Sequence, residues 1–143
     1  MRLGGAPWAN QGASAYEDWY LVRDMAALAP LNEAAVSGPR KAPHDAVARL
    51  AAGGAAGLYG LKLGAALSRP AGAAWFGKPA GMSYDALFAL LEPVVATAQG
   101  GLWIRQMVLG PTPEFCLQST GPALLPSPIE ALSLSLAAVW PAA

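Results

Sequence analysis

The sequence predicts a small α+β protein in which helices cover one face of an antiparallel sheet. The chain has 143 residues, of which 55% are hydrophobic and 13% are charged, and this suits one compact domain. Short runs of branched and aromatic residues, separated by Gly and Pro, are typical of strands. Between them lie segments that carry helix-start and helix-stop residues.

The first half of the chain predicts a strand and two helical segments. After a Gly/Pro/Asn arm at 1–15, residues 16–22 read Tyr-Glu-Asp-Trp-Tyr-Leu-Val and favour a strand. Asp24 is placed to cap a helix over 25–36, in which Pro30 predicts a kink or two short helices. A further helix is expected over 42–52, with Pro43 at its first position and Asp45 in its first turn.

The second half predicts strands around one strong helix. Strands are expected over 58–63 and 73–78, then over 102–109 and 114–118. Ser83 is a capping residue for a helix over 84–98. Its apolar side chains recur every three or four residues and form one stripe: Leu87, Leu90, Leu91, Val94 and Val95.

Residues 128–140 carry two conflicting signals. A capping box with Pro128 in the first turn favours a helix. The Leu-Ser alternation from Leu132 to Leu136 has the two-residue period of a strand. Both alternatives stay open from the sequence.

Without the segment 42–52, the predicted order is strand, helix, strand, strand, helix, strand. This order over residues 16–118 resembles the ferredoxin-like βαββαβ fold, and in particular the dimeric α+β barrel superfamily. The resemblance concerns element order alone, since no residue motif supports it. It implies a single domain with an extra helical segment after the first helix, a C-terminal extension at 119–143, and two sheets paired in a homodimer that often keeps an apolar cavity.

The strand over 102–109 gives a physical reason for the homodimer. Both of its sides are mainly apolar, although a sheet with helices on one face leaves its other face to water in a monomer. At roughly 25 cal/mol per Å² of apolar surface, pairing with a second sheet would recover several kcal/mol. The sequence therefore predicts a homodimer.

Composition excludes several classes of partner and cofactor. Nine basic and nine acidic residues give no net charge, so a nucleic acid or an anionic membrane is not expected as a partner. One Cys and one His cannot build a zinc site, and the glycines match neither a dinucleotide-binding fingerprint nor a Walker loop. No metal and no cofactor are predicted. Without a recognisable leader or spanning segment, we expect a cytoplasmic protein.

Arg105 is the most informative candidate binding residue. It lies between Trp103 and Met107 on one side of an apolar strand, where an unpaired charge is costly. One reading is an ion pair with an acid, for which Glu17, Asp18 and Glu114 are available. The other reading is that Arg105 holds an anionic ligand inside an apolar cavity lined by aromatic side chains. Those predicted lining residues are Trp19, Tyr59, Trp75, Trp103 and Met107.

Two residues are candidates for moving a proton. His44 is the only imidazole and lies at a helix start, which favours its neutral form, and Tyr20 carries a phenol. Cys116 could act as a nucleophile with His44, although the setting Phe-Cys-Leu is equally typical of a buried thiol.

Three functional hypotheses follow from these residues. The first is a protein that binds a small apolar or aromatic ligand, with an anionic group as one option, in the cavity of a dimeric α+β barrel. The second is a non-catalytic dimerisation or protein-interaction module. The third is a thiol enzyme that uses Cys116 and His44.

Overall fold

The computed structural model describes residues 2–3, 15–51, 55–109 and 112–139. The chain divides into two compact units, one formed by residues 18–54 and the other by residues 1–17 together with 55–143. We call them the helical unit and the sheet unit. Each is described by itself.

The helical unit contains α1 (Met25–Val36), a 3-10 turn η1 (Gly38–Arg40) and α2 (Lys41–Ala48). The predicted helix over 25–36 is confirmed, and the Asp24 carboxylate caps it by accepting a hydrogen bond of 3.0 Å from Ala27 N. Helix α1 continues through Pro30, so two separate short helices do not form. Helix α2 begins at Lys41 rather than at Pro43, because η1 leads directly into it.

The predicted strand over 16–22 is wrong. Only Ala15–Tyr16 (β2) are extended in a ladder, and their partner is Arg2–Leu3 (β1) in a separate two-stranded sheet. Residues 17–22 are not in a strand. Their aromatic and branched side chains favour extended backbone, but a strand also needs a neighbour for its N–H and C=O groups.

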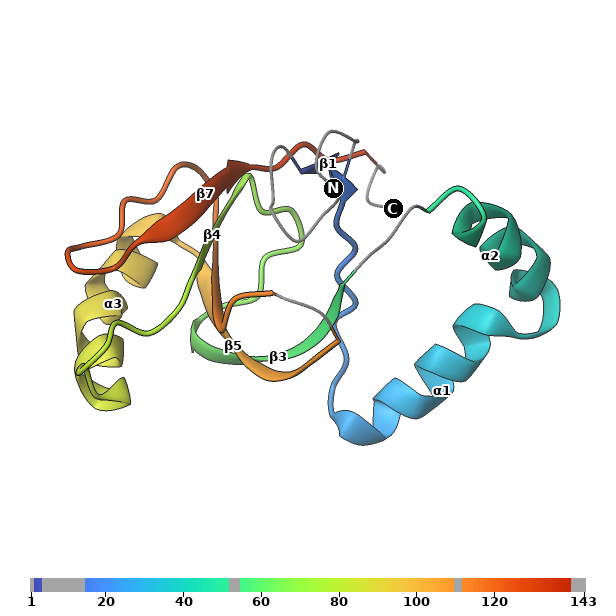
Figure 1. Cartoon of the computed structure of the whole chain (residues 1–143), viewed down its shortest axis with the longest axis horizontal. Coiled ribbons are helices and arrows are strands. Elements are labelled where there is room, and N and C mark those ends of the chain that lie inside the picture. The colour runs from blue at the N-terminus through green and yellow to red at the C-terminus, as the bar shows by residue number, and fades with distance from the viewer. Residues whose placement is uncertain (1, 4–14, 52–54, 110–111, 140–143) are drawn as a thin grey trace. The chain divides into compact units, whose positions relative to one another are not determined.

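The sheet unit contains a five-stranded antiparallel sheet in the order β3-β5-β6-β4-β7 (Figure 1). Its strands are β3 (Ala56–Gly64), β4 (Gly72–Phe76), β5 (Gly101–Leu109), β6 (Phe115–Ser119) and β7 (Ala131–Ser135). Four of these confirm predicted strands. The fifth, β7, settles the ambiguous C-terminal segment as a strand, because β4 offers it a full ladder from Phe76↔Ala131 to Gly72↔Ser135.

This strand order differs from that of a simple ferredoxin-like fold. The expected first strand is not part of the sheet, and β7 from the predicted C-terminal extension takes an edge instead. Strands β4 and β5 are both antiparallel to β6, which lies between them, so the crossover β4-α3-β5 joins two parallel strands that are not neighbours. The α+β class is confirmed.

Helix α3 (Tyr84–Ala98) packs on one face of the sheet and confirms the predicted helix (Figure 1). The Ser83 hydroxyl accepts a hydrogen bond of 3.1 Å from Ala86 N at its start. Its stripe of apolar residues meets the strands in a single hydrophobic core. The buried members of that core are Ala74, Phe76, Leu87, Leu91, Val95, Leu102, Phe115, Leu117 and Ile129.

The other face of the sheet is also buried over its central strands. Every residue of β4 and β6 is buried, and Trp75 and Trp103 are only 5% and 7% exposed. A single chain therefore removes these side chains from water, so this part of the sheet does not require a second copy. The homodimer stays a prediction. No helix among the described residues is both long and apolar enough to span a bilayer.

Candidate functional site

Strands β3, β4 and β5 bring four of the predicted binding residues to the face opposite α3. Tyr59 pairs with Arg105 across β3 and β5, while Trp103 and Trp75 both pair with Cys116 of β6. The rings of Tyr59 and Trp75 meet edge to face, with centroids 5.8 Å apart and an interplanar angle of 81°. These four side chains therefore lie on one face of the sheet.

Trp75 and Trp103 are buried, Tyr59 is half-buried and Arg105 is exposed, so Arg105 does not lie in an enclosed cavity of this chain. Trp103 Nε1 donates a hydrogen bond of 3.2 Å to Gln118 Oε1, and Arg105 Nη1 donates one of 2.8 Å to the Thr112 carbonyl. The Tyr59 hydroxyl lies 2.9 Å from the Pro113 carbonyl oxygen and 3.0 Å from Thr112 Oγ1. Burial raises the pKa of Tyr59 above its ordinary value. The Thr112 carbonyl thus accepts a hydrogen bond from the Arg105 guanidinium, for which the sequence predicts an acid or an anionic ligand as the partner.

The remaining predicted residues are more scattered. Met107 pairs with Leu58 and is 62% exposed. Trp19, Tyr20 and His44 belong to the helical unit, where Tyr20 is 71% exposed. His44 Nδ1 lies 3.4 Å from Asp45 Oδ1, its neighbour in α2.

Cys116 is fully buried in β6. Burial raises the pKa of its thiol well above the ordinary value, and the negative charge of Glu17 adds to that effect. A nucleophilic cysteine needs a lowered pKa and access to a substrate. The surroundings of Cys116 give it neither, which speaks against the thiol-enzyme hypothesis.

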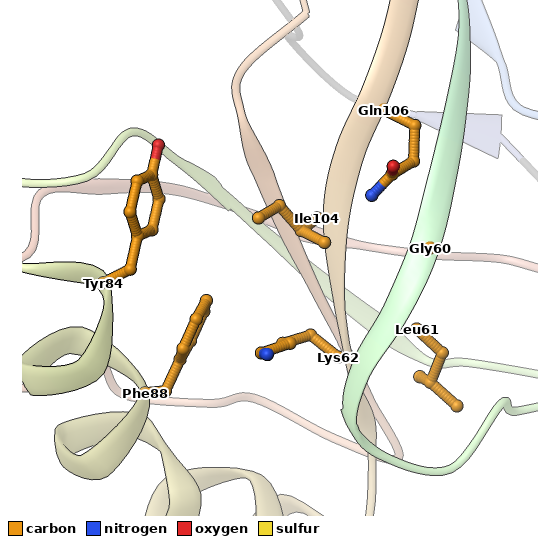
Figure 2. A pocket seen from close by; sticks show the side chains of 7 residues that line it. All are labelled: Gly60, Leu61, Lys62, Tyr84, Phe88, Ile104 and Gln106. Carbon is orange, nitrogen blue, oxygen red and sulfur yellow. The ribbon is translucent and has the colours of Figure 1, made fainter.

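A pocket of about 350 Å³ lies on the α3 side of the sheet (Figure 2). It is formed where the first turns of α3 face strands β3 and β5. Its lining residues come from these three elements: Gly60, Leu61, Lys62, Tyr84, Phe88, Ile104 and Gln106. This volume lies within the range of roughly 300 to 1,000 Å³ that is typical of small-molecule sites.

Two aromatic rings form the helical side of the pocket. Tyr84 and Phe88 are one helical turn apart in α3, and their rings stack with centroids 6.0 Å apart at 29°. Ile104 faces them from β5, as Figure 2 shows. The pocket is therefore mainly apolar, with flat surfaces on the helical side.

Lys62 and Gln106 supply the polar groups of the pocket. The Lys62 ammonium lies 4.6 Å from the centroid of the Phe88 ring, which is a cation–π contact. Gln106 projects from β5 beside Gly60, and a Cβ atom added at Gly60 would come within 3.2 Å of Gln106 Nε2. The absence of a side chain at Gly60 thus keeps this end of the pocket open.

Tyr84 is held from outside the pocket. Its hydroxyl donates a hydrogen bond to Glu114 Oε1, and the Lys78 ammonium lies 5.5 Å from the centroid of its ring. The hydrogen bond to the Glu114 carboxylate raises the pKa of the Tyr84 phenol. Lys78 in turn donates a hydrogen bond of 2.7 Å to the Met82 carbonyl. These contacts fix the ring that lines the pocket mouth.

Sequence reasoning missed Lys62, Tyr84 and Phe88. Two signals were available: aromatic residues four apart at a capped helix start, and a single cation in the otherwise uncharged strand 56–64. Neither signal shows that α3 crosses these strands, because that contact depends on the tertiary fold.

The described residues contain no group of three His, Cys, Asp or Glu side chains arranged to hold a metal ion. In the pocket, the groups that could contact a ligand are the Lys62 ammonium, the Gln106 amide and the Tyr84 phenol. The resemblance to dimeric α+β barrels stays a prediction, since no family model, no curated protein and no solved structure matches this chain.

Proposed function

We propose that this protein binds a small ligand that has a flat apolar body and one anionic group. The observation that carries the proposal is the exposed Lys62 ammonium above the Phe88 ring, at the edge of an open, largely apolar pocket of about 350 Å³. This conclusion agrees in class with the first functional hypothesis. The proposed site lies on the face of the sheet that packs against α3, whereas the sequence predicts a site on the face that carries Arg105.

The aromatic pair supports a flat ligand. Phe88 and Tyr84 present stacked rings opposite Ile104, and a planar apolar molecule gains most contact between such surfaces. Phe88 and Ile104 are half-buried, so a ligand placed on them would remove further apolar surface from water. The open end at Gly60 leaves room beside the Gln106 amide.

Lys62 supports an anionic group on that ligand. It is the only cation among the lining residues, and no acid lines the pocket. Charge-assisted hydrogen bonds from an ammonium to a carboxylate, sulfonate or phosphate are stronger than neutral ones. The Gln106 amide offers two further donors at the Gly60 end of the pocket.

A matched pair of ligands tests this proposal. We expect 2-naphthoate to bind the whole chain about fivefold or more tightly than the neutral 2-naphthalenemethanol, as measured by isothermal titration calorimetry. Lys62→Met should abolish that preference and leave binding of the alcohol nearly unchanged. Gly60→Val should weaken both ligands, because its side chain would enter the space beside Gln106.

The control is Lys41→Met, which removes the same charge from the exposed surface of α2. This variant should retain the preference for the carboxylate. Equal affinity of the unaltered protein for both ligands, or an equal loss in the Lys41 and Lys62 variants, would refute an anion site at Lys62.

A further inference from the structure

Gln106 gives the ligand pocket a second polar group, separate from the Lys62 ammonium. It lines the pocket from β5, and its amide lies beside Gly60 of β3. The side chain is exposed and, within the described part of the chain, makes no hydrogen bond. The amide is therefore available both to donate to a ligand and to accept from it.

Gln106 is an extra residue in the ladder between β3 and β5. Leu58 pairs with Met107 across the two strands. The next residue of β3, Tyr59, pairs with Arg105, so the ladder skips Gln106. A β-bulge of this kind redirects a side chain, and bulges are over-represented next to functional sites.

Lys62 is the corresponding extra residue on the opposite strand. The ladder skips it between the pairs that Leu61 and Leu63 form with β5. As a result, Lys62 and Leu63 both lie on the α3 side of the sheet, where one contacts Phe88 and the other packs against the core. The two register shifts of this strand pair thus coincide with the two polar residues, Lys62 and Gln106, that β3 and β5 contribute to the pocket.

These two polar groups lie at different ends of the pocket. Lys62 follows Gly60 by two residues on β3, which is roughly 7 Å along an extended strand. From there the Lys62 ammonium extends to the Phe88 ring, whereas the Gln106 amide stays beside Gly60, as Figure 2 shows. A ligand that contacts both groups therefore carries two polar substituents, separated by its apolar body.

We propose that the ligands of this pocket are aromatic acids that carry a neutral hydrogen-bonding group, such as a hydroxyl, at the end of the ring system opposite the carboxylate. The assignment rests on the proposed function, because Lys62 provides the site of the carboxylate. A hydroxyl suits the Gln106 amide, since both groups can donate and accept a hydrogen bond. A second anionic group does not suit it, because Lys62 is the only cation among the described lining residues.

The test adds one hydroxyl to 2-naphthoate. We expect 6-hydroxy-2-naphthoate to bind the whole chain about threefold or more tightly than 2-naphthoate in isothermal titration calorimetry. Gln106→Leu should bind these two carboxylates with equal affinity, because Leu fills a similar volume but has no hydrogen-bonding atoms. The same variant should still prefer 2-naphthoate to 2-naphthalenemethanol, since that preference depends on Lys62.

Two controls check that the position of the hydroxyl and the position of the amide both matter. In 3-hydroxy-2-naphthoate the hydroxyl is next to the carboxylate, so its affinity should be the same in Gln106→Leu as in the unaltered protein. Gln99→Leu removes an exposed amide at the far end of α3 from the pocket. This variant should keep the preference for 6-hydroxy-2-naphthoate.

The outcomes distinguish the role of Gln106 from the anion site at Lys62. Equal affinity of the unaltered protein for 6-hydroxy-2-naphthoate and 2-naphthoate would overturn the role of Gln106, even where the preference for 2-naphthoate over the alcohol is found. A hydroxyl preference that persists in Gln106→Leu would overturn it as well. Equal affinity for 2-naphthoate and the alcohol would instead refute the anion site, and the ligand class would fail with it.

Discussion

The hydroxyl of Tyr84, the first residue of α3, donates a hydrogen bond to Glu114, the residue that precedes β6. This contact joins the helix start to the β5–β6 connection across 30 positions of sequence. It also fixes one ring of the proposed ligand pocket, because Tyr84 lines that pocket beside Phe88.

Removal of the charge on Glu114 should lower the pKa of Tyr84. The Glu114 carboxylate favours the neutral phenol, both by accepting its hydrogen bond and by repelling the phenolate. In Glu114→Gln we expect Tyr84 to ionise at lower pH, as followed by NMR of ring-labelled tyrosine. Glu130→Gln is the matched control, and the same shift in both variants would show that the contact with Glu114 is not its cause.

Truncation of α3 within the core should be costly. Leu91 is fully buried in the cluster that includes Phe115 and Leu102, so Leu91→Ala leaves a cavity between α3 and the sheet. We expect it to lower the free energy of unfolding by roughly 2 to 5 kcal/mol in urea titrations. Leu124→Ala, at a side chain 90% exposed, should change the free energy of unfolding by less than about 0.5 kcal/mol.

Gly100, the residue before β5, should tolerate no side chain. A Cβ atom there would lie 1.9 Å from the Gln118 carbonyl oxygen, which is backbone and cannot move independently. Gly100→Ala should therefore force β5 and β6 apart and lower the melting temperature by several degrees. The matched variant is Gly77→Ala, where an added Cβ meets nothing within 4 Å. A melting temperature of Gly100→Ala equal to that of Gly77→Ala would contradict the register of these strands.

Cys116 should make the protein less stable in alkaline solution. Its pKa is raised in the folded state, so the fold holds the thiol proton more tightly than the unfolded chain does. The resulting stabilisation is complete below the unfolded pKa and is lost as pH rises towards the folded one. We expect the free energy of unfolding to fall above about pH 9, by up to 1.4 kcal/mol per pH unit.

Cys116→Ala separates this effect from other alkaline titrations. The variant should lose some stability at every pH from the smaller side chain, but its decline above pH 9 should be shallower than that of the unaltered protein. Parallel declines would show that the thiol does not ionise on unfolding. Tyr59, whose pKa is also raised by burial, contributes only at still higher pH in both proteins.

Elements with strong local signals could be predicted from the sequence. Helix α3 begins at Tyr84 and ends at Ala98 as expected, because the Ser83 cap and the apolar stripe both act within a few residues. Strand β7 shows the limit of such signals. Its capping box and its two-residue alternation compete locally, and the open edge of β4 decides between them.

The strand order and the pocket could not be predicted in the same way. Residues 16–22 have the composition of a strand, but among the described residues only Tyr16 has a partner strand, because pairing is a non-local property. Alternation along residues 102–109 predicts that Trp103, Arg105 and Met107 share one side of the strand, whereas the contact of Lys62 with Phe88 depends on where α3 crosses the sheet. Sequence periodicity indicates which side chains share a face of the sheet, but it does not indicate which face carries a pocket.

The position of β6 between β4 and β5 has a consequence for biosynthesis. A ribosome releases β4, α3 and β5 before β6. The edges of β4 and β5 that pair with β6 therefore stay unpaired until Ser119 has left the exit tunnel. The backbone N–H and C=O groups of β4 and β5 that will pair with β6 remain hydrated during this interval. The part of the sheet formed by β4, β6 and β5 is thus completed only after β6 has emerged, and chaperones can engage the unpaired strands until then.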